Sequence, residues 1–228
     1  MSGVNTTVAL GYLLATVGFV VGLHLMNSPA TARRGSRIST AGMVIAVAVT
    51  LVKVINDGTI TTTGWIVLSA GALVGAVAGL WMAREVKMTA IPQLVSLFNA
   101  VGGGAAALIA IADFVRLADH AHVAIPTHIT LFTLFDVIIG CVTFSGSLIA
   151  AGKLQGWITG QPVVFPGARL LTGILAAVAV GGSAYVLAGN NSIAVLVTVS
   201  VAALIFGVTM VMPIGTPWAL KSLNQRSP

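Results

Sequence analysis

The sequence predicts an all-α membrane protein, a polytopic helical bundle with about seven transmembrane helices. A low charge content, long apolar runs and the placement of the basic residues all point to this class. Of the 228 residues, 57% are hydrophobic and only 7% are charged, whereas a soluble domain carries about 25% charged residues. So few charges cannot cover a surface that faces water, and we expect most of the surface to face lipid.

Seven apolar runs are long enough to cross a bilayer as helices, which takes about 20 residues each. Gly, Pro, Asn and Asp separate the runs, as is typical of turns. The strands of a membrane barrel would instead be about ten residues long with alternating polarity. We expect the helices near residues 6–26, 39–56, 63–83, 91–115, 127–151, 168–188 and 193–213.

The basic residues predict the orientation. A formal net charge of +6 raises the question of nucleic acid, but these residues lie in short segments beside apolar runs, the pattern that orients membrane proteins. We therefore expect no nucleic-acid partner, an N-terminus outside and a C-terminus in the cytoplasm. The predicted loops after runs one, three, five and seven hold Arg33, Arg34, Arg37, Arg84, Lys87, Lys153, Arg169, Lys221 and Arg226, whereas Arg116 and arguably Lys53 lie on the other side.

Glycines recur inside two of the runs at spacings that let helices approach closely. Because they lie within apolar helices and not between a strand and a helix, they do not form a nucleotide-binding loop. We expect helix packing from Gly71, Gly75, Gly79, Gly102, Gly103 and Gly104.

One amide lies deep in the fourth run. Asn99 is eight residues beyond Ile91, about 12 Å along a helix and near the middle of the bilayer. Its neighbours on the same face are small, so the amide is expected to face another helix or a narrow space. It either bonds a neighbouring helix or orients water, and it cannot store a proton because an amide has no titratable group.

The fifth run carries a polar stripe. Asp136, Gly140, Thr143 and Ser147 are spaced four, three and four residues apart, which places them on one helix face. Such a stripe either lines a water path or packs against a neighbouring helix, with the hydroxyls bonded to their own helix. The spacing alone does not choose between these alternatives.

Other reactive residues give weaker signals. His120 and His122 lie beside Asp119 in an outer loop; this cluster could bind a metal, but without a helical frame it is a weak signal, and we expect no metal. Cys141 lies inside an apolar run and is expected to be a small packing residue. The residues alone indicate a transporter, a channel or a membrane subunit of a larger machine.

Two long motifs narrow these alternatives. The segments KMTAIPQLVSLFNAVGGGAAALIA and VTFSGSLIAAGKLQG, the latter at 142–156, resemble the membrane domain of the beta subunit of proton-translocating NAD(P) transhydrogenase. The continuation QPVVFPGA at 161–168 and FGVTMVMPIG at 206–215 resemble the same family, and NSPATARRG echoes the text after its first span. The resemblance covers residues 7–215.

The resemblance implies a function. Such enzymes couple hydride transfer from NADH to NADP to inward proton movement, so we expect a multi-pass protein of the bacterial plasma (inner) membrane. It implies that NAD(H) and NADP(H) bind soluble domains of the complete complex and that this chain binds neither. It also implies transhydrogenase alpha subunits as partners and a homodimer of protomers in the lipid bilayer.

The resemblance also implies a proton path. Many members have histidine where this chain has Asn99, and the variant with asparagine places its histidine on a partner-subunit helix. The serine of the family motif falls on Ser147, whereas Ala90 replaces an acid that is frequent in the family, and Asp136 has no family counterpart. The expected proton path comprises Asn99, Ser147, Thr143 and Asp136.

The last residues depart from the family. We expect residues 1–215 to be a partial transhydrogenase membrane domain and residues 216–228 to be an atypical tail, with the NADP(H)-binding domain absent. Such a chain would not transfer hydride alone. The alternative is a truncated non-catalytic membrane protein, or a small transporter or assembly factor that retains the fold.

The predicted orientation can be tested with reporter fusions. A reporter joined at Ser36 is expected to be active only in its cytoplasmic form, and one joined at His122 only in its exported form, because the basic residues hold the intervening segments on opposite sides. Enzyme assays on intact cells would measure both. An exported reporter at Ser36 would overturn the assignment.

Overall fold

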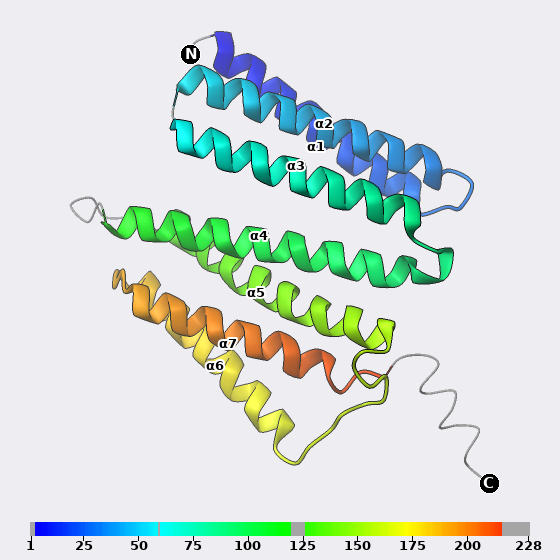
Figure 1. Cartoon of the computed structure of the whole chain (residues 1–228). Coiled ribbons are helices and arrows are strands. Elements are labelled where there is room, and N and C mark those ends of the chain that lie inside the picture. The colour runs from blue at the N-terminus through cyan, green and yellow to red at the C-terminus, as the bar shows by residue number, and fades with distance from the viewer. Residues whose placement is uncertain (1–2, 59, 120–125, 216–228) are drawn as a thin grey trace. The chain divides into compact units, whose positions relative to one another are not determined.

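Seven long helices make up the structure, a computed structural model that describes residues 3–58, 60–119 and 126–215 (Figure 1). Within these residues all seven are long and apolar enough to cross a membrane. This confirms the predicted all-α, multi-pass membrane fold. In chain order the elements are α1 (Gly3–Met26), α2 (Ala32–Asp57), α3 (Thr62–Glu85), the short 3₁₀ helix η1 (Met88–Ala90), α4 (Ile91–Asp119), α5 (Thr127–Gln155), α6 (Ala168–Leu187) and α7 (Ile193–Val211).

One predicted boundary is wrong. Helix α2 begins at Ala32 and not near residue 39, so Arg33, Arg34 and Arg37 lie on its first turns and not in a loop. Alanine and arginine are strong helix formers, and Pro29 precedes the helix, where its ring obstructs no helical hydrogen bond. The arginines keep their place at the end of the span, so the argument about orientation does not change.

The chain divides into two compact units, Met1–Leu80 and Trp81–Pro228. In the first unit, α1 and α2 pack along each other through glycines. A Cβ atom added to Gly35 would lie 2.6 Å from the carbonyl oxygen of Gly22, and one added to Gly42 would lie 3.0 Å from that of Ala15. The two backbones are therefore in direct contact, as small residues allow in membrane helices.

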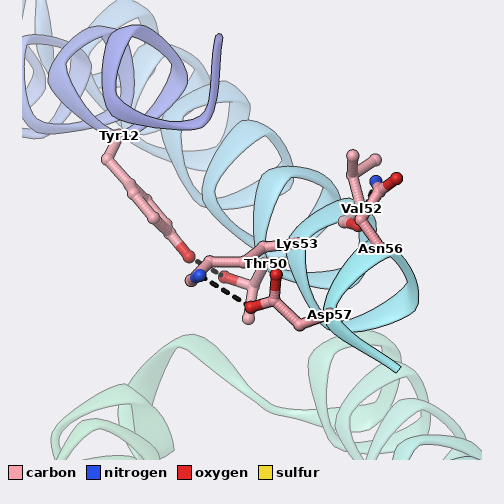
Figure 2. A network of polar contacts seen from close by, with 6 residues as sticks. All are labelled: Tyr12, Thr50, Val52, Lys53, Asn56 and Asp57. Carbon is pink, nitrogen blue, oxygen red and sulfur yellow. Dashed lines mark hydrogen bonds and ion pairs between the residues drawn. The ribbon is translucent and has the colours of Figure 1, made fainter. Parts of the chain in front are cut away.

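A polar network lies toward the end of α2 (Figure 2). Tyr12 on α1 and Thr50 on α2 form a hydrogen bond of 2.9 Å between their hydroxyls, and the Asn56 side chain donates to the Val52 carbonyl at 2.8 Å. The Lys53 ammonium pairs with Asp57 at 2.7 Å. Because Asp57 balances its charge, Lys53 adds little to the positive charge on the side that we predict to be outside.

Helix α3 presents a different surface. None of its residues is buried, and a Cβ atom added to Gly71, Gly75 or Gly79 would meet no heavy atom of the described residues within 4 Å. Within the first unit, the close backbone contacts through glycine thus lie between α1 and α2, and the predicted ladder on α3 makes no such contact with the described residues of that unit.

In the second unit, α5 is the shared helix. It packs against α4 on one side and α7 on the other, and α6 packs mainly against α7. Two close approaches set these contacts: a Cβ atom added to Gly103 would lie 2.9 Å from the carbonyl oxygen of Gly140, and one added to Gly207 would lie 2.5 Å from that of Val142. The core between these helices contains Ala107, Ala110, Phe114, Leu134, Val137, Cys141, Val186, Leu196 and Ala203.

Neighbouring glycines on α4 give a matched pair of variants. A methyl group at Gly103 would lie 2.8 Å from the Thr143 side chain and 2.9 Å from a backbone oxygen, whereas one at Gly102 would meet nothing within 4 Å. We expect Gly103→Ala to lower the free energy of unfolding by about 1–3 kcal/mol and Gly102→Ala to be neutral or slightly stabilising. Titration with a denaturing detergent, followed by circular dichroism, would measure both. Equal effects would contradict the close approach.

Candidate functional site

Helix α4 presents a line of polar side chains to α5. The helix starts at Ile91, directly after η1, and Pro92 lies in its first turn, where a missing N–H costs no helical bond. Gln93, Ser96 and Asn99 follow at intervals of three residues, so they lie along one side of the helix. Each of the three donates a hydrogen bond to α5.

The deepest of these bonds joins the two motifs of the predicted proton path. The Asn99 Nδ2 atom donates to the Ser147 Oγ atom at 2.8 Å. Asn99 is exposed on the surface of this unit, and Ser147 is partly buried. The structure therefore brings together the amide and the hydroxyl that the family resemblance pointed to, and it places them at the edge of the contact between α4 and α5.

Two further residues extend this line, and the sequence analysis missed both. The Ser96 hydroxyl donates to the Ser147 carbonyl at 3.0 Å, and the Gln93 amide donates to the Leu154 carbonyl at 3.0 Å. The Oε1 atom of Gln93 is buried and makes no hydrogen bond with the described residues. Their spacing of three and six residues before Asn99 is the signal that could have found them.

The other predicted path residues lie farther along α5. Thr143 is partly buried and packs against Gly103. Asp136 is exposed and makes no hydrogen bond or ion pair within the part of the chain that the structure describes. Eleven residues separate it from Ser147, about 16 Å along the helix, so the structure does not bring Asp136 to the Asn99 contact.

The glycines of α4 differ from one another. Gly103 meets the backbone of Gly140, and a Cβ atom on Gly104 would lie 2.8 Å from the Phe144 ring. Gly102 faces open space. Gly103 and Gly104 therefore form the close contact with α5, and Gly102 leaves room on the exposed side, next to the Asn99 edge.

A cavity lies at each end of the α4–α5 pair. The first, of about 230 Å³, lies where α4 begins and is lined by Val86, Ala90, Gln93, Leu94, Leu97, Ala151, Gln155 and Trp157. The second, of about 490 Å³, lies at the other end and is lined by Asp113, Arg116, Leu117, Ile129 and Thr133. The Asn99–Ser147 contact lies between them along the helices.

The side chains of this line are hydrogen-bond donors and acceptors without a titratable group. A serine hydroxyl donates one hydrogen bond and accepts two, whereas an amide both donates and accepts but has no titratable proton. Asn99 and Ser147 can therefore orient and pass hydrogen bonds, and a proton that stops along the line needs a carboxylate or a partner group. Asp136 is the one carboxyl group in the sequence of α5.

Two other expectations can be placed, and a third concerns residues that the structure does not describe. Cys141 is buried among apolar side chains of the core, as predicted for a packing residue. Lys153, which was expected in a loop, lies in the last turn of α5 and is buried, because its ammonium bonds backbone carbonyls at the end of α7. His120 and His122 lie outside the described residues.

Comparison with known proteins agrees with these features. The sequence model of the NAD(P) transhydrogenase beta subunit matches residues 8–217. Two curated relatives, the NAD(P) transhydrogenase subunit beta of Rhodospirillum rubrum and that of its strain ATCC 11170, are each 36% identical over 162 residues. The alignment covers 68% of this chain and 33% of each relative, so the chain matches about a third of their length. The chain belongs to the NAD(P) transhydrogenase beta subunit family.

Proposed function

We propose that this chain is the membrane proton-path part of a proton-translocating NAD(P) transhydrogenase, which couples hydride transfer from NADH to NADP to inward proton movement. The observation that carries the proposal is the 2.8 Å hydrogen bond between Asn99 and Ser147. It joins the two motifs on which the family resemblance rests, and Asn99 lies two residues beyond Leu97, which lines the first cavity. Polar groups at such depth are costly and usually functional.

The α4 side chains would act by holding hydrogen bonds in place. From the first cavity inward, Gln93, Ser96 and Asn99 each bond α5, so a file of water beside them would meet fixed donors and acceptors. Ser147 accepts from Asn99 and keeps its own hydroxyl hydrogen to donate onward. Chains of this kind polarise one another, which favours proton transfer along them.

Asp136 is proposed as the group on this chain that holds the proton toward the outer end. It lies one turn from Thr133, which lines the second cavity, and on the same side of α5 as Thr143 and Ser147. Its carboxyl group can take up and release a proton, which the amide of Asn99 cannot do.

The nucleotides and partners belong to the complete enzyme. The described residues form helices and short turns, without the glycine-rich turn between a strand and a helix that holds dinucleotides. We propose that NAD(H) and NADP(H) bind other domains or subunits, that alpha subunits complete the protomer, and that two protomers assemble in the bacterial inner membrane.

The central contact can be removed with Asn99→Leu in the complete complex. We expect coupled hydride transfer and proton pumping to fall about tenfold or more, because the Ser147 hydroxyl loses its fixed donor and the water file loses its orientation. Inverted membrane vesicles with a pH-sensitive dye and an NADP analogue would measure both rates. Ser147→Ala is expected to give a smaller loss.

The matched control is Phe98→Leu. Phe98 is the neighbouring residue and is 47% exposed, so this variant changes the same helix without touching the polar line and should keep the parent rates. Parent rates in Asn99→Leu would contradict a proton-path role and would favour a non-catalytic membrane protein that retains the fold.

The role of Asp136 has a separate test. Asp136→Asn keeps the size of the side chain and removes its proton-binding group, so we expect proton pumping to fall about tenfold. The control is Asp57→Asn, which removes a carboxylate in the other unit that is paired with Lys53. Unchanged pumping in Asp136→Asn would place the resting proton on a group outside this chain.

A further inference from the structure

Lys153 is a buried cation that the proton path does not use. It lies in the last turn of α5 and is only 2% exposed. Its Nζ atom donates to the backbone carbonyls of Val211, Met212 and Ile214 at 3.1, 2.6 and 2.9 Å. An ammonium group has three hydrogens to donate, so these three acceptors satisfy it completely.

The acceptors explain how the charge is tolerated. Val211 is the last residue of α7, and Met212 and Ile214 follow it. Carbonyls at the end of a helix lack helical partners and carry partial negative charge, so they compensate the ammonium without a carboxylate. A buried cation that loses its partners is strongly unfavourable, and Lys153 is therefore a firm link between α5 and the end of α7.

A third segment meets at the same point. The Met212 carbonyl also accepts a hydrogen bond from the backbone N–H of Val163, at 3.0 Å. Val163 belongs to the connection between α5 and α6. The Lys153 junction, defined here as Lys153, Val163, Val211, Met212 and Ile214, thus joins α5, the connection that follows it and the end of α7.

The junction lies close to the Asn99 contact along the same helix, α5. Lys153 follows Ser147 by six residues, about 9 Å along α5. At about 100° per residue the two side chains leave the helix on different sides, so Ser147 meets α4 while Lys153 meets the end of α7. A shift of α5 that makes or breaks the Asn99–Ser147 bond would carry the junction with it.

We propose that Lys153 is a positioning residue that ties the position of residues 211–214 to the state of the Asn99–Ser147 contact. Its consequence for catalysis rests on the proposed function, whereas its effect on the junction does not. In this arrangement α5 carries two contacts: the hydrogen bond on the proposed proton path, and the hydrogen bonds that hold the residues after α7. If Lys153 were only a static clamp, it would hold the end of α7 in place, and that segment would not respond to a change at Asn99.

The test uses hydrogen exchange of the peptide that contains Val163, in the complete complex in lipid nanodiscs. Lys153→Met keeps the length of the side chain and removes its charge, and we expect the Val163 amide to exchange about ten- to a hundredfold faster. Lys153→Arg keeps the charge and should restore slow exchange at least in part. Lys87→Met is the matched control, because Lys87 is exposed and lies outside the junction, and it should change nothing.

The decisive variant is Asn99→Leu, which leaves the junction itself intact. We expect it to speed exchange at Val163 by about threefold or more, because coupling between two sites acts in both directions. Unchanged exchange at Val163 in Asn99→Leu would overturn the proposal and leave Lys153 as a static clamp. Unchanged exchange in Lys153→Met would overturn it as well.

Measurements of coupled activity distinguish a failure of this proposal from a failure of the proposed function. If Asn99→Leu loses coupled activity but leaves Val163 exchange unchanged, the proton path stands and the coupling through Lys153 is refuted. If Asn99→Leu keeps its activity but speeds Val163 exchange, the coupling is supported and the proton path is refuted. Size-exclusion chromatography of each variant would confirm that the complex is assembled.

Discussion

The close approach of α4 and α5 at Gly103 and Gly140 is the constraint on which the second unit depends. Without side chains at these positions the two backbones touch, and the short side chains of Ser96 and Asn99 can then reach α5. A larger separation would take these donors out of reach of their partners on α5, and those hydrogen bonds would be lost. The polar contacts therefore depend on the glycine contacts, because the glycines set the distance between the two helices at which the polar side chains reach their partners.

Helix α5 packs against both α4 and α7 in this unit. One side carries Ser147 and Thr143 along α4, and another side packs on α7 through the contact between Gly146 and Gly207. Its last turn holds the end of α7 through Lys153. A helix with two such partners can move only if both contacts adjust, since packed interfaces shift between discrete arrangements and do not deform smoothly.

The sequence predicted the number and type of the elements well, because run length and hydropathy report directly on lipid contact. It predicted the start of α2 poorly, since arginines can continue a helix beyond the membrane as readily as they can form a loop. It also placed Lys153 in a loop, because a positive charge beside an apolar run has the same pattern whether it faces water or the carbonyls of a neighbouring helix.

The residue pattern could not predict which helices pack against each other. The periodicity of α4 gave a face for Asn99, but only the family motifs pointed to Ser147, and neither indicated Ser96 or Gln93. The glycines show the same limit. Gly75 on α3 and Gly103 on α4 lie in similar small-residue patterns, yet of the two only Gly103 contacts another backbone within the described residues. A small-residue pattern shows that a close approach is possible, but it does not identify the partner helix.

The orientation of the Asn99 amide has one more consequence. Its nitrogen donates one of its two hydrogens to Ser147, so the second hydrogen and the carbonyl oxygen remain for other partners. That edge of the membrane domain therefore offers both a donor and an acceptor from one neutral group, so it can orient a species that does both, such as water, without binding its proton.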